Sequence, residues 1–202
     1  MAGKRTDARG YFRGHRRAAV VLGTLLLAVA GMLTAFFLTR DNEPQIVSAP
    51  VIVKNESYDD LGANPLTECR NEDISRAVLK YYARLSEQAD YTEAYEDMSI
   101  YTKKGLYENT YIVFATYNMK IKGIYTPVPG LGTLYVEQTP DGTTKVEAQA
   151  EDADTRQAVT AVTAHEDVRG LFRQVEDAYN QAVSSDALLA EALSDLQNAA
   201  GE

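Results

Sequence analysis

The chain has 202 residues and a net charge of −9, with a single cysteine and no tryptophan. This acidity argues against binding to the phosphates of DNA or RNA. The lone Cys69 excludes an intramolecular disulfide and a multi-cysteine metal site. It is therefore either a free structural thiol near a helix start or a link to a second copy of the chain.

Residues 18–38 (AAVVLGTLLLAVAGMLTAFFL) carry no charge and lie between Arg17 and Arg40. A helix of this length spans about 31 Å, close to the ~30 Å hydrocarbon core of a bilayer, so we predict one transmembrane helix. A cleaved signal peptide would have a shorter apolar stretch and a small-residue cleavage site, which FFLTRDNEP does not resemble. Gly31 and Ala35 have a spacing that lets two such helices approach closely, although it is also frequent by chance.

Residues 1–17 form a basic tail in which six Lys and Arg residues oppose the single Asp7, a net charge of +5 (6 − 1). Basic residues beside a membrane span tend to stay in the cytoplasm. We therefore expect a cytoplasmic N-terminus and an extracellular C-terminal part. The same tail could bind anionic lipid headgroups, or it could serve only to set the topology.

The extracellular part is expected to begin with a flexible linker over residues 39–70, because its three prolines and scattered acids leave no helical stripe. Apolar residues at helical spacing, from Ile74 to Leu85, then predict a helix over residues 73–88. Residues 90–98 (DYTEAYEDM) follow as a short link or one more helical turn.

From Ser99 the hydrophobic period changes from 3.6 to 2, which predicts two strands joined across residues 105–109. In the second strand one face is apolar throughout, and the opposite face is apolar only at its start. The fully apolar face consists of Val113, Ala115, Tyr117, Met119 and Ile121. We expect an antiparallel sheet with one covered face and one partly covered face.

Residues 124–130 (IYTPVPG) are predicted to break the sheet, because their two prolines cannot donate ladder hydrogen bonds. The TPDG turn then predicts a hairpin over residues 131–149. Helical spacing returns in residues 155–164, 166–183 and 188–196. The order of helix, antiparallel strands and helices predicts one α+β domain over residues 71–198.

Catalytic and metal-binding signatures are absent from this pattern. His165 is the one histidine after the predicted membrane span, and it lies in AHED rather than in the HExxH motif of zinc proteases. We interpret it as a residue of a surface loop. Glu166 and Asp167 beside it are explained by the helix dipole better than by a metal site. No cofactor is predicted.

Tyrosines are abundant, and several fall on or near the predicted strands. Aromatic side chains on a sheet either line a ligand pocket or fill the core, and we favour the core. If a pocket exists, its first candidate residues are Tyr117, Met119 and Tyr135.

Three stretches of this sequence together resemble a known group of proteins. YTKKGL, YIVFATYNMKIKGIYTPVPGLGTLYV and HEDVRGLFRQVEDAYNQAV, with the DG turn, are similar to membrane-anchored outer-surface proteins of Gram-positive bacteria. The resemblance covers about residues 71–196 and implies an NTF2-like, or cystatin-like, α+β domain with no assigned activity. It departs from that fold in having only residues 89–98 between the first helix and the sheet, which leaves the usual cone open at one end.

Three functions compete at this point. The first is a non-catalytic binding or assembly module of the cell envelope, held outside the cell by one helix, with a protein partner and a possible homodimer. The second is a scaffold component of a type IV secretion or conjugation apparatus, an expectation that rests on architecture alone. The third is an NTF2-like enzyme or small-ligand binder, which would need an acid or histidine on the inner sheet face, where none is predicted.

Overall fold

The structure is a computed structural model that describes residues 53–200, with side chains to residue 198. Within this part of the chain it is an α+β domain with a five-stranded antiparallel sheet in the order β1-β2-β3-β4-β5 and four helices, which confirms the predicted fold class. The elements are β1 (Thr67–Glu68), α2 (Glu72–Gln88), β2 (Thr92–Lys104), β3 (Thr110–Ile121), β4 (Val128–Gln138), β5 (Thr144–Glu147), α3 (Ala153–Thr163), α4 (Glu166–Ser185) and α5 (Ala187–Ala200).

The first helix begins where the sequence predicts it. The side chain of Asn71 caps α2 by accepting hydrogen bonds from the backbone N–H groups of Asp73 (3.0 Å) and Ile74 (3.3 Å). Acidic residues occupy the first turn, where they interact favourably with the helix dipole. Ile74, Val78 and Tyr82 of this helix are buried against the sheet.

The predicted link over residues 90–98 is wrong, because β2 already begins at Thr92. Its pairing with β3 shifts register between Thr92 and Ala94 and again between Glu96 and Ser99, and Asp97 has a φ of 50°. Such bulges insert extra residues and so destroy the strict alternation that identifies a strand in the sequence. The turn over residues 105–109 is where it was predicted.

β4 also begins earlier than predicted, at Val128, so the break after β3 covers only residues 122–127. Pro129 lies inside the strand, opposite Asn118 of β3. β5 pairs with β4 only from Tyr135 to Gln138, so among the described residues the N-terminal half of β4 is an edge. A proline is tolerated on an edge because the outward N–H that it lacks has no ladder partner there.

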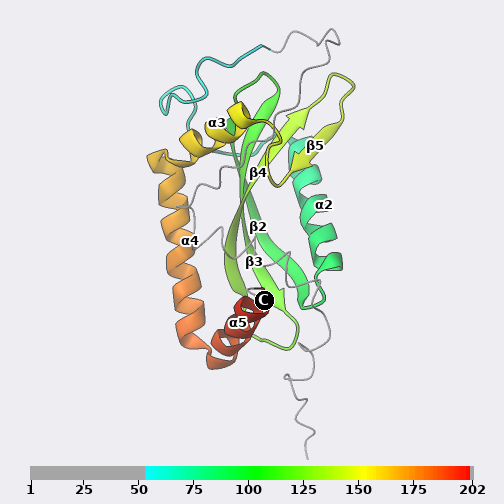
Figure 1. Ribbon diagram of the computed structural model, residues 1–202, viewed down its shortest axis with the longest axis vertical. Coiled ribbons are helices and arrows are strands. Elements are labelled where there is room, and N and C mark those ends of the chain that lie inside the picture. The colour runs from blue at the N-terminus through cyan, green and yellow to red at the C-terminus, as the bar shows by residue number, and fades with distance from the viewer. Residues whose placement is uncertain (1–52, 201–202) are drawn as a thin grey trace, which may run out of the picture.

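The sheet has helices on both faces (Figure 1). One face packs against α2 and carries the five alternating residues predicted for it, from Val113 to Ile121. The opposite face carries Ile112 and Phe114, which pack with residues of α3 and α4. The prediction of one fully covered and one partly covered face is therefore confirmed.

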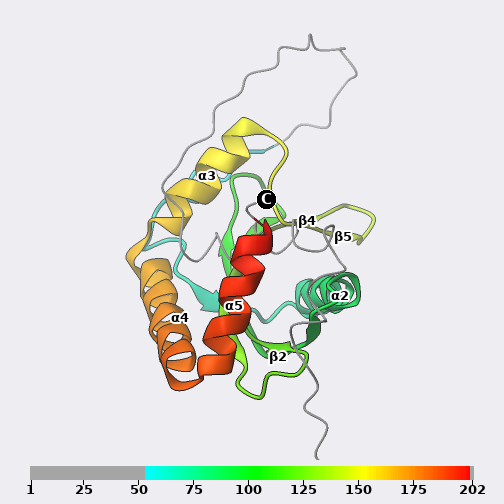
Figure 2. The same ribbon diagram turned by 60° about the horizontal axis from the view of Figure 1, so that its bottom comes forward.

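The last helix covers one end of this sandwich. Figure 2 shows α5 crossing between α4 and α2 at the end of the sheet. Asp186 separates α4 from α5 and accepts hydrogen bonds from the N–H groups of Leu188 (2.9 Å) and Leu189 (3.2 Å). Leu189, Leu193 and Leu196 are buried in the same cluster as α2.

Residues 53–66, which we call the strap, pack against the domain although they fall in the predicted linker. The backbone of Val53 accepts a hydrogen bond from Glu108 (3.0 Å), and the N–H of Asn55 donates to Leu106 (2.7 Å). Asn64 is 3% exposed, and its side chain bonds both the N–H (2.7 Å) and the C=O (3.0 Å) of Lys104. The end of the predicted linker is thus part of the fold.

The basic tail (residues 1–17) and the predicted transmembrane helix (residues 18–38) lie outside the described residues. Each helix found between residues 53 and 200 is too short or too polar to span a bilayer.

Candidate functional site

The structure places the three candidate pocket residues on two different faces of the sheet. Tyr117 (7% exposed) and Met119 (3%) face α2 and belong to its core cluster. Tyr135 lies on β4 at an odd position, and odd positions of β4 such as Leu131 face α3 and α4. The three residues therefore do not converge on one site.

Around Tyr117 the α2 face is filled by aromatic rings. The ring centroid of Tyr117 lies 5.1 Å from that of Tyr82 on α2 and 5.0 Å from that of Tyr95 on β2, and Tyr82 and Tyr95 are 5.1 Å apart. Tilted and edge-to-face contacts at this separation are favourable. Burial raises the pKa of Tyr95 to about 12, so its hydroxyl stays protonated at neutral pH.

Two glycines of β4 make room for these rings. A Cβ atom at Gly130 would overlap the ring of Tyr117, and a Cβ atom at Gly132 would overlap the hydroxyl of Tyr82. The tyrosines therefore lie directly on the bare backbone of β4. This arrangement is a packed core in which the glycines are required by close approach.

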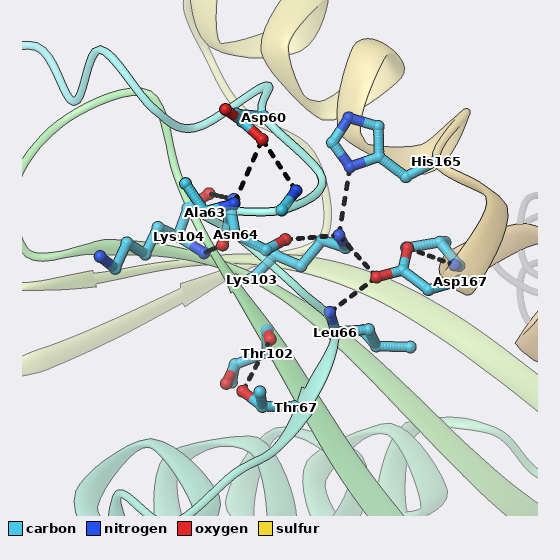
Figure 3. A network of polar contacts seen from close by, with 12 residues as sticks. Asp60, Ala63, Asn64, Leu66, Thr67, Thr102, Lys103, Lys104, His165 and Asp167 are labelled. Carbon is cyan, nitrogen blue, oxygen red and sulfur yellow. Dashed lines mark hydrogen bonds and ion pairs between the residues drawn. The ribbon is translucent and has the colours of Figure 1, made fainter.

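The most unusual polar group of the domain is Lys103 on β2, whose side chain is completely buried. Figure 3 shows its Nζ atom surrounded by acceptors from the strap and from the region where α4 begins. The distances are 2.6 Å to the backbone oxygen of Asn64, 2.8 Å to Oδ2 of Asp167 and 3.1 Å to Nδ1 of His165. An ammonium group has three N–H donors, so this lysine is fully satisfied.

His165 is the N-cap residue of α4, and its side chain is only 11% exposed. Its second ring nitrogen, Nε2, lies 3.1 Å from Oδ1 of Asp59 in the strap. Because the ammonium of Lys103 can only donate, Nδ1 must accept, and the proton of a neutral ring therefore sits on Nε2. His165 lies in the loop between α3 and α4, as interpreted, but its side chain is largely buried and contacts the strap.

Asp167 completes the group from the first turn of α4. Its Oδ2 atom also accepts from the N–H of Leu66 (2.7 Å), and Oδ1 accepts from the N–H of Val168 (2.8 Å). Burial alone would raise the pKa of this carboxyl group, but the hydrogen bonds from Lys103, Leu66 and Val168 hold that pKa below its usual value. The carboxylate therefore stays charged opposite Lys103.

The side chains of Lys103, His165 and Asp167 are linked to one another and to the strap by hydrogen bonds and an ion pair. What the group does is join three segments that are distant in the sequence: the strap, β2 and α4. We call Lys103, His165, Asp167 and Asp59 the latch.

Sequence reasoning missed the latch, although one signal was available. Lys103 pairs with Ile112 across the β2–β3 hairpin, and Ile112 belongs to the cluster under α3 and α4. Directly opposed residues of an antiparallel pair point to the same face. The hairpin register therefore places Lys103 among apolar side chains, where a charge needs a partner.

The structure offers no support for a metal centre in the residues that it describes. No group of three or more His, Cys, Asp or Glu side chains between residues 53 and 198 is arranged to hold an ion. Near His165, Glu166 pairs with Arg173 at 2.6 Å, and Asp167 pairs with Lys103.

No protein-family model, curated protein or solved structure matches this chain.

Proposed function

We propose that the protein is a single-pass membrane-anchored module of the bacterial cell envelope, with its N-terminus in the cytoplasm and its α+β domain outside. The proposal rests first on the sequence, where an uncharged stretch over residues 18–38 follows a tail with a net charge of +5 (6 − 1). Its role is to bind or assemble with a protein partner, and it carries out no catalysis.

One observation favours a binding role above the others: the two most exposed large apolar residues of the described part of the chain, Tyr125 and Leu188, lie at the end of the domain opposite to the start of the strap. Val53 bonds to the β2–β3 turn, where β3 starts. Tyr125 (98% exposed) lies in the loop where β3 ends, and Leu188 (66% exposed) lies in the first turn of α5. The length of β3, about 40 Å at 3.3 Å per residue, separates the two ends.

Tyr125 and Leu188, which we call the tip residues, belong to one corner of the domain. The carboxylate of Asp186 bonds to Thr126, next to Tyr125, and also caps the helix that carries Leu188. Figure 1 shows the strap at one end of the domain and the turn between α4 and α5 at the other. A chain anchored through its strap end would therefore present the tip residues away from the membrane. Tyrosine is enriched among the residues that carry most of the binding energy of protein interfaces.

The absence of catalysis in this proposal is supported by what fills the interior. Tyr117 and Met119 pack in the core, and the polar atoms of the latch are already satisfied. We also keep the NTF2-like fold as a proposal. It is supported by the long helix α2, which lies on the sheet face that carries Tyr117. The short connection from α2 to β2, residues 89–91, is the departure from that fold expected from the sequence.

Site-specific crosslinking in intact cells tests the binding role. A photoreactive amino acid is placed at Tyr125, at Leu188 or, as a control, at Leu79, which is 48% exposed on α2. We expect the same discrete crosslinked species from both tip positions and none from Leu79. Equal crosslinking at all three positions, or none at the tip, would refute a partner at this end.

A further inference from the structure

We infer that the partner bound at the tip residues presents a basic surface, because acidic side chains lie on both sides of Tyr125 and Leu188. This inference rests on the proposed binding role and adds the charge of the partner. It is carried by the Asp and Glu residues of segments 87–97 and 186–191, which we call the tip acids.

The first acidic segment lies beside the loop that carries Tyr125. Nζ of Lys122, at the start of this loop, donates to the backbone carbonyl of Asp90 (2.8 Å) in the connection between α2 and β2. Three acidic residues around this connection are exposed: Glu87, Asp90 and Glu93. The loop of Tyr125 and these acids therefore lie at the same end of the sheet.

The start of β2 continues this negative surface. Glu96 lies opposite Asn118, near the end of β3. Asp97 follows with a φ of 50°, and its carboxylate accepts a hydrogen bond from the side chain of Asn118 (3.0 Å). Both acids are exposed, so β2 adds two more negative charges to the tip end of the domain.

The second acidic segment lies on the other side of the tip residues. The carboxylate of Asp186 accepts a hydrogen bond from the N–H of Leu188 (2.9 Å). It also bonds to Thr126, the residue that follows Tyr125. Glu191 is exposed three positions after Leu188, and residues at this spacing share one side of a helix. Negative charge therefore flanks both tip residues.

The lysines at this end already have partners. Nζ of Lys120 lies 3.1 Å from Oε2 of Glu96, and Nζ of Lys122 is bonded to a backbone carbonyl. In the described segments 87–97, 118–127 and 186–191, these two lysines oppose seven tip acids, a net charge of −5 (2 − 7). A field of this sign speeds association with a basic surface and opposes association with an acidic one.

The same charge argues against a second copy of the chain bound tip to tip. Such a pair would bring two sets of tip acids together, and like charges that face each other across an interface are unfavourable. A partner of opposite charge fits better. In the arrangement that we infer, Tyr125 and Leu188 fill apolar sites of the partner, and its Lys and Arg residues face the tip acids at the rim.

Charge reversal combined with crosslinking in intact cells tests this inference. The full chain carries a photoreactive amino acid at position 188, and the crosslinked species is measured relative to the total amount of the chain. Glu87→Lys combined with Glu93→Lys reverses two tip acids and should lower the yield about fivefold or more, because the attraction that speeds association is lost.

Glu56→Lys combined with Glu151→Lys is the matched control. It changes the net charge by the same amount in the strap and just before α3, near the ion pair of Lys54 with Asp154, and should leave the yield unchanged. An unchanged yield in the tip variant, or an equal loss in both variants, would overturn the inference and leave the proposed binding in place. A wild type without the crosslinked species would refute the proposed binding, and the inference would fall with it.

Salt dependence keeps the test decisive if the tip variant fails to fold. In isolated membranes, raising NaCl from 0.05 M to 0.5 M should lower the wild-type yield about threefold or more, because salt screens exposed charges. Apolar contact alone would give a yield that salt leaves unchanged or raises. Either of these two results would overturn the inference.

Discussion

Nζ of Lys103 lies 2.8 Å from Oδ2 of Asp167, and this ion pair joins β2 to the first turn of α4. The lysine side chain is completely buried, and the carboxylate is 27% exposed. Solvent therefore reaches the carboxylate of this pair but not the ammonium group. Backbone N–H groups of Leu66 and Val168 hold the carboxylate in place.

Breaking this pair from the acidic side should be costly, because it leaves a buried ammonium group without its anion. We expect Asp167→Ala to lower the free energy of unfolding by about 3 kcal/mol, as measured by urea denaturation. Glu166→Ala is the matched control, since Glu166 pairs with Arg173 on the surface, and it should leave the urea midpoint almost unchanged. Equal losses in the two variants would contradict this account of the pair.

The same carboxylate makes stability depend on pH in a defined direction. Its pKa is lower in the folded state than in the unfolded chain, so its contribution is present above the unfolded value, near pH 4, and is lost as the pH falls through the folded value. Asp167→Asn should therefore show a shallower decline of the urea midpoint between pH 5 and pH 2.5 than wild type. Identical declines would show that Asp167 titrates alike in both states.

Contact between Gly132 and Tyr82 predicts a coupled pair of substitutions. Gly132→Ala places a methyl group against the hydroxyl of Tyr82, which is 2% exposed, and should cost about 1–3 kcal/mol. Tyr82→Phe removes that hydroxyl, so the double variant should lose less stability than the sum of the single variants. Strict additivity in thermal or urea unfolding would contradict the packing described here.

The tip residues should be dispensable for folding. Tyr125→Ser and Leu188→Ser remove side chains that are 98% and 66% exposed, so each should change stability by less than about 0.5 kcal/mol. Tyr125→Ser should nevertheless weaken the crosslink formed from a photoreactive amino acid at position 188 in intact cells, and Leu188→Ser should weaken the one formed from position 125. A variant that unfolds, or one that leaves the crosslink from the other position unchanged, would separate the tip from the proposed binding.

The sequence was sufficient for the elements whose patterns are regular. Helical spacing defined α2 and α4, and alternation along β3 assigned Val113 to one face and Ile112 to the other. β2 was recognised only from Ser99, because bulges around Glu96 interrupt its alternation. Pro129 hid the start of β4, since an edge position could not be inferred before the sheet order was known.

The candidate site was harder to predict because it is built from long-range contacts. Asp59 and His165 are 106 positions apart, and no local pattern joins them. Tyr117 and Tyr135 are an even number of positions apart, which would place them on the same face of a single strand. They lie on different strands, however, and the loop between β3 and β4 breaks the alternation. The two side chains therefore face opposite sides of the sheet. Burial of Lys103 depends on the strap, which has no periodicity of its own.

Cysteine labelling in intact cells tests the central claim, an outward-facing domain on a cytoplasmic tail. Tyr125→Cys and, separately, Ala2→Cys are introduced together with Cys69→Ser, and the cells are treated with a membrane-impermeant maleimide. The account predicts that position 125, which is 98% exposed, is labelled in intact cells, whereas position 2 is labelled only after lysis. Labelling of position 2 in intact cells, or of position 125 only after lysis, would contradict it.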